Sequence, residues 1–186
     1  MGNKICVPLA DAFHFRNSLL KEDVIPIIKQ WWEDGELCFG VEEFAFSFDV
    51  VVDIEQHFLV FDTDRNGKVD AHEVFMAYIL LAAGDLELKV DTAFSVFAGK
   101  ADSLNFDELV MLVEACLRGV RKVCKFDVEI PEDEVLFHCR SAFDLFQIPH
   151  TGRISRQQFS KWVLSEPYPR TFVQWVHMPQ MLQEED

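Results

Sequence analysis

The chain has 186 residues, of which 49% are apolar and 18 are Phe, so it can bury a sizeable core as one domain or as two small packed lobes. Its 32 acidic residues against 17 basic ones give a formal net charge of −15. This charge excludes nucleic acid as a reasonable partner, because the phosphate backbone carries the same sign, and it favours cations and basic peptides.

Cysteine usage and the absence of long apolar runs indicate a reducing compartment. The odd number of cysteines argues against a closed disulfide framework, and none of them form a CxxC pair: Cys6, Cys38, Cys116, Cys124 and Cys139. No run approaches 18 uninterrupted apolar residues, and the N-terminus lacks the apolar core of a secretory signal. We therefore expect a cytoplasmic protein.

The N-terminus MGNKIC resembles an N-myristoylation signal, in which Gly2 accepts the lipid after removal of Met. Position 6 is Cys6, where Ser or Thr is expected. Myristoyl on Gly2 and palmitoyl on Cys6 would supply the two chains that stable anchoring requires. The alternative is an ordinary Met-Gly start, so we expect a membrane partner only if the chain is acylated.

The first of four related segments is WWEDGELCFGVEEF, Trp31 to Phe44. It keeps an apolar residue before Glu43 and Phe44 but has no series of oxygen ligands. We identify it as a repeat only by comparison with the second segment, which is complete.

The second segment, Asp62 to Glu73, carries the twelve-residue EF-hand pattern. Gly67 at position 6 accepts the positive φ of the bend, and Val69 at position 8 can pair with a neighbouring loop. The expected metal ligands stand at positions 1, 3, 5, 7, 9 and 12, and position 7 offers only its backbone carbonyl: Asp62, Asp64, Asn66, Lys68, Asp70 and Glu73. Such a flexible oxygen cage with a bidentate carboxylate suits Ca²⁺ better than Mg²⁺. A solvated acidic loop is the alternative.

Apolar residues recur at helical spacing on both sides of this segment, which predicts helix, loop, helix. They are Val51, Val52, Ile54, Phe58, Leu59 and Phe61 before it, and Val74, Phe75, Ala77, Tyr78 and Leu81 after it.

The third segment, Ala93 to Val113, keeps Leu104 at position 8 and Glu108 at position 12. Its loop is one residue short, has no carboxylate at positions 1 or 3 and lacks the central Gly. We therefore expect no metal there.

The fourth segment, Ala142 to Val163, keeps Gly152 and Ile154. Gln147, Pro149 and Thr151 replace the acids, and Gln158 stands where Glu is expected. Without negative charge such a loop cannot offset the dehydration of a divalent ion. The aromatic residues of the third and fourth segments are kept nonetheless, which predicts that their helices pack: Phe94, Phe97, Phe143, Phe146, Phe159 and Trp162.

Together the four segments resemble the EF-hand, or calmodulin, superfamily from about Asp23 to Val163. The start MGN, the disabled first segment and the sound second one resemble the recoverin, neuronal calcium sensor and calcineurin B group. Membership implies an all-α fold of two lobes, each a pair of hands joined by a two-stranded ribbon, and a groove for an amphipathic target helix. Light chains and calaxin-like axonemal subunits are similar in that they tolerate eroded loops.

We expect an N-terminal lobe at 1–84, a C-terminal lobe at 85–164 and an apolar tail at 165–186. The tail either lies in the groove of its own C-terminal lobe or docks on a partner. A basic cluster, which indicates a solvated helix end or a site for an acidic partner or lipid, follows the third segment: Arg118, Arg121, Lys122 and Lys125.

No feature of the sequence indicates an enzyme or a small-molecule substrate. The six His are scattered, and the chain has neither a nucleophile elbow nor a phosphate-binding loop. We expect a non-enzymatic adaptor that binds one Ca²⁺ and a helix of a larger protein. The alternatives are a Ca²⁺-independent structural subunit, for example in a cilium or the cytoskeleton, and an acylated sensor on a membrane.

Overall fold

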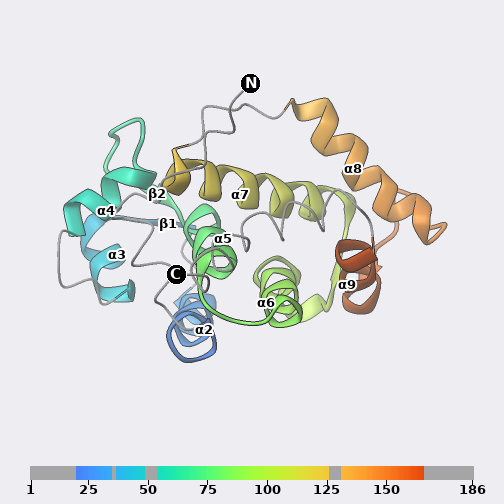
Figure 1. The fold of residues 1–186 in the computed structure, drawn as a ribbon, viewed down its shortest axis with the longest axis horizontal. Coiled ribbons are helices and arrows are strands. Elements are labelled where there is room, and N and C mark those ends of the chain that lie inside the picture. The colour runs from blue at the N-terminus through green and yellow to red at the C-terminus, as the bar shows by residue number, and fades with distance from the viewer. Residues whose placement is uncertain (1–19, 35–36, 49–53, 126–130, 166–186) are drawn as a thin grey trace, which may run out of the picture. The chain divides into compact units, whose positions relative to one another are not determined.

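The computed structural model describes residues 20–34, 37–48, 54–125 and 131–165 (Figure 1). The described part is mostly helical and carries two short antiparallel ribbons, which confirms the all-α class. Gly2, Cys6 and the predicted tail from residue 166 onward lie outside the described residues. No helix among those described is both long and apolar enough to cross a membrane.

The described residues fall into two compact units. Those within 1–83 and 118–127 form unit 1, and those within 84–117 and 128–186 form unit 2. The C-terminal part of one long helix, α7, therefore belongs to unit 1, and its N-terminal part belongs to unit 2. The predicted lobes 1–84 and 85–164 stay a prediction, and nothing in the sequence pattern indicates that residues 118–127 group with the first unit.

Unit 1 consists of short helices and one ribbon. In chain order its elements are the π-helical turn η1 (Leu20–Val24), α2 (Ile25–Asp34), β1 (Cys38–Phe39), α3 (Val41–Phe48), α4 (Ile54–Phe61), β2 (Val69–Asp70), α5 (Ala71–Leu81) and the end of α7. Strands β1 and β2 are antiparallel, with Phe39 opposite Val69. The pairing of Val69 with a neighbouring loop agrees with its predicted place at position 8.

Helix α5 forms the centre of unit 1, since every side chain from Val74 to Leu81 is buried. A helix that is apolar on all sides can be stable only when other elements surround it. The ring of Phe75 meets the rings of Trp31 and Phe39 edge on, with centroids 4.9 and 5.6 Å apart. These contacts fix α2 and β1 against α5.

Unit 2 repeats the same plan. Its elements are α6 (Leu86–Ala98), the 3₁₀ turn η2 (Gly99–Ala101), β3 (Ser103–Leu104), α7 (Phe106–Cys124) up to Leu117, α8 (Glu132–Leu145), β4 (Ile154–Ser155) and α9 (Arg156–Ser165). Strands β3 and β4 are antiparallel, with Leu104 opposite Ile154. Both of these side chains are fully buried.

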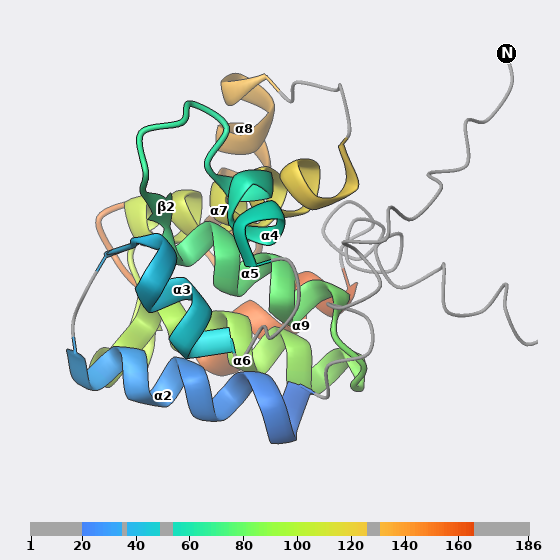
Figure 2. The same ribbon diagram turned by 90° about the vertical axis from the view of Figure 1, so that its left-hand side faces the viewer.

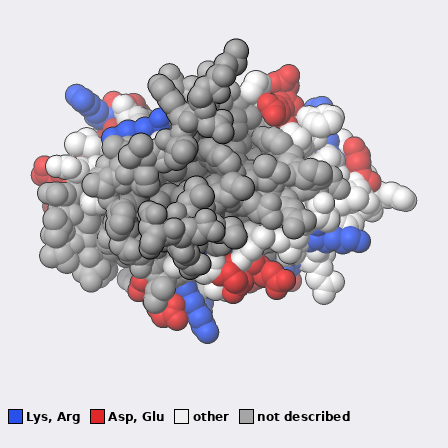
Figure 3. Space-filling view, in the orientation of Figure 1, with Lys and Arg blue, Asp and Glu red and all other residues white. Residues whose placement is uncertain are grey.

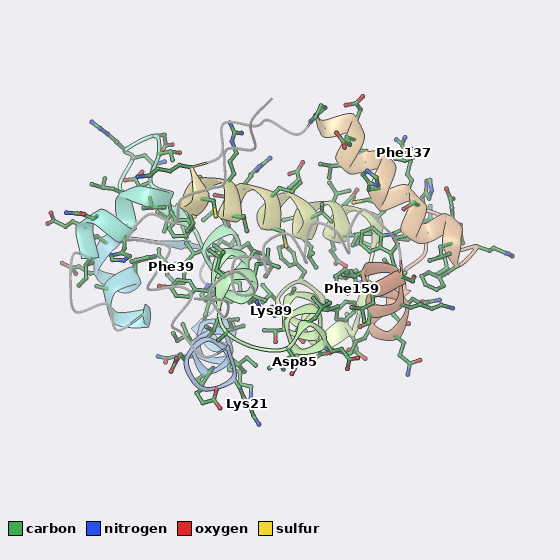
Figure 4. All side chains as sticks on the ribbon, viewed as in Figure 1. Lys21, Phe39, Asp85, Lys89, Phe137 and Phe159 are labelled. Carbon is green, nitrogen blue, oxygen red and sulfur yellow. The ribbon has the colours of Figure 1, made fainter. Side chains whose placement is uncertain are left out.

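The aromatic residues predicted to pack in the third and fourth segments form much of the core of unit 2. Phe94, Phe143, Phe159 and Trp162 are buried, and Phe159 is labelled in Figure 4. Phe97 and Phe146 are half-buried. The unit therefore holds an aromatic core although its loops lack a metal-ligand series.

Charged side chains of both signs lie on the surface. Acidic side chains occupy several separate places around the outline of the face in Figure 3, with basic side chains among them. The four described cysteines, Cys38, Cys116, Cys124 and Cys139, are free thiols.

Candidate metal centre

The loop between α4 and β2 is held in shape by Asp62, the first predicted metal ligand. The Oδ1 atom of Asp62 accepts a hydrogen bond from the backbone N–H of Asn66 at 2.9 Å, and its Oδ2 atom accepts one from Gly67 at 3.0 Å. Gly67 has φ of 76°, which a glycine adopts without strain. The bend lies in the loop between α4 and β2, which Figure 2 shows, and it has the positive φ that the sequence predicts at Gly67.

The next two predicted ligands are bonded to each other. Asn66 donates its side-chain N–H to Asp64 Oδ2 at 2.8 Å and accepts the backbone N–H of Lys68 on its Oδ1 atom, also at 2.8 Å. Asp64 and Asn66 are both exposed. The loop thus holds these two oxygen-bearing side chains together without any help from the two helices.

Asp70 at position 9 caps helix α5. Its Oδ1 atom accepts backbone N–H groups from His72 and Glu73 at 2.8 and 3.2 Å. Partial burial alone would raise the pKa of Asp70, but hydrogen bonds from His72 and Glu73 outweigh it and hold that pKa below its ordinary value. Asp70 is consequently an ionised ligand candidate at neutral pH.

Glu73 at position 12 is a buried carboxylate, with 8% of its surface exposed against 5% for Asp62. Its Oε2 atom lies 2.7 Å from the Nζ atom of Lys122, which comes from the part of α7 that belongs to unit 1. The angles of this contact are poor for a hydrogen bond, and Oε2 accepts none among the described residues. We treat the contact as an ion pair, because Coulomb attraction depends on distance and not on these angles.

The residues at position 12 of the other three segments have a different role. Glu43, Glu108 and Gln158 each accept a hydrogen bond from the backbone N–H three residues earlier in the chain, on Gly40, Asn105 and Ser155. In the third and fourth segments the bond is reciprocated, which makes a capping box. Glu73 makes no such bond with Asp70, whose side chain caps α5. Its carboxylate faces Lys122 instead.

Guanidinium groups hold the loops of unit 2. Arg153 donates to Glu108 Oε2 at 2.7 Å and to the carbonyl of Ser103 at 2.7 Å. Glu108, the predicted position 12 of the third segment, therefore already has a cation as its partner. These bonds need no metal, so they can hold the shape of a loop that has no metal-ligand series.

Arg156 connects helix α6 to Asp102, which lies in the turn before β3. It donates to Asp102 at 2.8 Å and to Ser95 Oγ at 2.9 Å, pairs with Asp91, and lies 4.8 Å above the ring of Phe94. Burial alone would lower the pKa of Arg156, but the bonds to Asp91 and Asp102 raise it above its ordinary value. Asp102 has φ of 48° and takes the left-handed conformation that the missing glycine would supply.

The loop Asp62 to Glu73 fits a Ca²⁺ ion by its donor types and its backbone. Its carboxylates, amide and backbone carbonyl are hard oxygen donors, and the buried Oε2 of Glu73 accepts no hydrogen bond from the described residues. The side chains are not gathered in metal-bound geometry, however, since no three His, Cys, Asp or Glu side chains within the described ranges converge on one point. Asp64 is turned toward Asn66 and Glu73 toward Lys122.

Lys122 is the residue of this site that the sequence did not reveal. Its side chain is mostly covered, pairs with Glu73 and donates a hydrogen bond to the carbonyl of Phe61, so the interpretation as a solvated helix end is wrong for this member of the basic cluster.

No model of a known protein family matches the chain.

Proposed function

We propose that this chain is a non-enzymatic Ca²⁺-binding adaptor or regulatory subunit, built from two pairs of EF-hand-like segments of which only the second binds metal. Two antiparallel ribbons, each joining two loop regions, support the pairing. The ligand set is Asp62, Asp64, Asn66, the Lys68 carbonyl, Asp70 and Glu73. Bound Ca²⁺ would supply charge neutralisation and a link between the two ends of the loop.

One observation carries the proposal: among the four residues at position 12, only Glu73 is not used to cap its own helix. A bidentate Glu at position 12 closes the coordination shell in EF-hands. The other three segments have no ligand series, and in each of them the side chain at position 12 is bonded at the start of its own helix. A single Ca²⁺ per chain follows.

Calorimetric titration of the full-length chain tests this stoichiometry. We expect one Ca²⁺ per chain in the wild type and loss of most of the binding in Glu73→Gln, which withdraws one of the two carboxylate oxygens. Glu108→Gln is the matched control, because it makes the same change at position 12 of the third segment, and it should leave Ca²⁺ binding unchanged. Two or more ions per chain, or equal losses in the two variants, would contradict the proposal.

The partner we propose is a helix of a larger protein. Large apolar side chains exposed on unit 2 support a protein partner, since they are costly to leave in water: Met111, Leu145 and Phe137, the last being 65% exposed and labelled in Figure 4. Nucleic acid and small-molecule substrates are not part of the proposal. We also propose a cytoplasmic localisation, which includes association with a cilium or the cytoskeleton.

A second candidate is a structural subunit in which Ca²⁺ regulates nothing. The guanidinium groups of Arg153 and Arg156 favour it, because they hold the loops of unit 2 without metal. The two candidates differ in their response to Ca²⁺. A regulatory subunit changes its tryptophan fluorescence at micromolar Ca²⁺, whereas a structural subunit does not.

The membrane alternative depends on the N-terminus. If Gly2 is myristoylated and Cys6 palmitoylated, the chain is a peripheral membrane sensor. Intact mass measured on protein from the native source tests this alternative, and an unmodified N-terminus rules it out.

A further inference from the structure

We infer that the C-terminal end of α7, residues 118–124, is a Ca²⁺-sensitive latch on the loop Asp62 to Glu73. Lys122 and Ca²⁺ compete for the carboxylate of Glu73, so that Ca²⁺ binding releases this helix end from α5. The inference rests on the Ca²⁺ site proposed above and adds how that site is regulated. Both partners belong to unit 1.

Lys122 occupies the place of a cation at this loop. Its Nζ atom lies 2.7 Å from Glu73 Oε2 and donates a hydrogen bond to the carbonyl of Phe61 at 2.8 Å. Phe61 immediately precedes the first predicted ligand, and Glu73 is the last. One ammonium group therefore spans the start and the end of the loop.

Two cations cannot share this carboxylate at full strength. A Ca²⁺ ion takes both oxygens of the Glu at position 12, at about 2.3 to 2.6 Å, and Lys122 already holds one of them. The ammonium and the metal would also repel each other beside the buried carboxylate of Glu73. Binding of either one therefore weakens binding of the other, and by linkage the effect is the same in both directions.

The helix end touches the same residue a second time, through Gly119. A Cβ atom placed on Gly119 would lie 2.2 Å from the backbone oxygen of Glu73 and 3.2 Å from the backbone nitrogen of Ala77. Residues 119 and 122 are three positions apart and therefore share one face of α7. This face has two contacts with Glu73, one at its backbone and one at its side chain, so a movement of the carboxylate toward a metal acts directly on the docked helix.

The test compares the Ca²⁺ affinity of three full-length proteins by competition with a chelator dye. We expect Lys122→Met to bind Ca²⁺ about tenfold more tightly than the wild type, because the competing ammonium is gone. Lys125→Met is the matched control, since Lys125 is exposed and carries the same charge directly after the end of α7. Its affinity should change by no more than about twofold, as expected for a screened charge at a distance.

Hydrogen exchange of the backbone amides in residues 118–124 reports the release itself. We expect faster exchange in the wild type when Ca²⁺ is added and no such change in Glu73→Gln. Because Lys122→Met leaves a buried carboxylate without its cation, its metal-free form can be less stable. The wild-type exchange measurement does not depend on the stability of that variant.

The results separate the latch from the proposed function. Equal Ca²⁺ affinity in the wild type and Lys122→Met, or unchanged exchange in residues 118–124 on addition of Ca²⁺, overturns the latch and leaves the Ca²⁺ site standing. Absence of Ca²⁺ binding in both the wild type and Lys122→Met overturns the proposed function and the latch together.

Discussion

At the scale of single residues, helix capping links positions 9 and 12 of a segment. In the second segment Asp70 at position 9 caps α5, and Glu73 returns no bond to it and pairs with Lys122. In the third and fourth segments position 9 is Asn105 or Ser155, and each forms a capping box with the residue at position 12. Helix capping thus gives Glu108 a structural role in a loop that has no ligand series.

Lys89 on α6, labelled in Figure 4, is a buried lysine whose charge should lower the stability of the fold at neutral pH. It is 1% exposed, and burial lowers its pKa from 10.5 to about 8. At pH 7 the folded and unfolded chains both carry the proton, so the cost of burying the charge, about 3 kcal/mol, is fully present. Between pH 8 and 10.5 the folded protein binds fewer protons than the unfolded chain, so stability rises with pH and this cost fades.

Lys89→Met should therefore raise the free energy of unfolding by about 3 kcal/mol at pH 7, since Met has a similar length and no charge. The gain should fall below about 1 kcal/mol at pH 10. Urea unfolding of both proteins at the two pH values measures it. Lys100→Met, which changes an exposed lysine of the same unit, should be neutral. A gain that is equal at both pH values would show that hydrophobic packing and not charge burial is responsible.

The residues of the loop were predictable, but their cationic partners were not. The ligand spacing and the positive φ of Gly67 follow from a local pattern within twelve residues. Lys122 is bonded to a residue 61 positions away, and Arg156 to one 65 positions away. A single sequence contains no periodicity that links such pairs. The sequence therefore shows the positive charge of these residues but not their partners.

At the scale of elements, the helices and ribbons arise from different signals. Apolar periodicity predicts α4 and α5, whose bounds Ile54–Phe61 and Ala71–Leu81 flank the loop. The ribbons have only two residues per strand, and their strands are recognisable mainly because Val69, Leu104 and Ile154 occupy position 8 of their segments. No sequence pattern predicts that residues 118–127 group with unit 1. In the sequence, Gly119 is only a residue of low helix propensity.

The close approach of α7 to α5 predicts the effect of Gly119→Ala. In a helix without contacts this change stabilises by about 1 kcal/mol. Here the new Cβ would meet backbone atoms of Glu73 at 2.2 Å and 3.2 Å, which cannot move aside as the end of a side chain can. We expect a loss of about 1 to 3 kcal/mol in the free energy of unfolding, as for other overpacked sites. The sign is diagnostic: a more stable variant in urea unfolding would mean that α7 does not dock on α5.

At the scale of the whole molecule, the two units use cations of different kinds. Unit 1 has an acidic loop in which the carboxylate of Glu73 faces Lys122, and in the proposed latch Ca²⁺ displaces that lysine. Unit 2 has two arginines whose bonds to Glu108, Asp91 and Asp102 are internal to the fold. Arginine is not expected to lose its proton at any pH a protein tolerates, so this arrangement is permanent where a metal would come and go. The units should therefore respond differently to a chelator.

Addition of EGTA to the Ca²⁺-loaded chain should change unit 1 and leave unit 2 as it is. The measurement is hydrogen exchange at the ribbons. Amides of Phe39 and Val69 should change their protection when Ca²⁺ is removed, because their ribbon adjoins the proposed Ca²⁺ loop, whereas amides of Leu104 and Ile154 should not.

Arg156→Gln is the complementary variant. It should lower the protection of Leu104 and Ile154 with and without Ca²⁺, because it withdraws the charge that faces Asp91 and Asp102.

Because unit 2 is held by arginines and not by a metal, a partner that binds unit 2 should stay bound in EGTA. Loss of protection at Leu104 in the wild type on chelation would mean that a metal ion and not the arginines holds unit 2, and would restore an ordinary Ca²⁺ switch in both units.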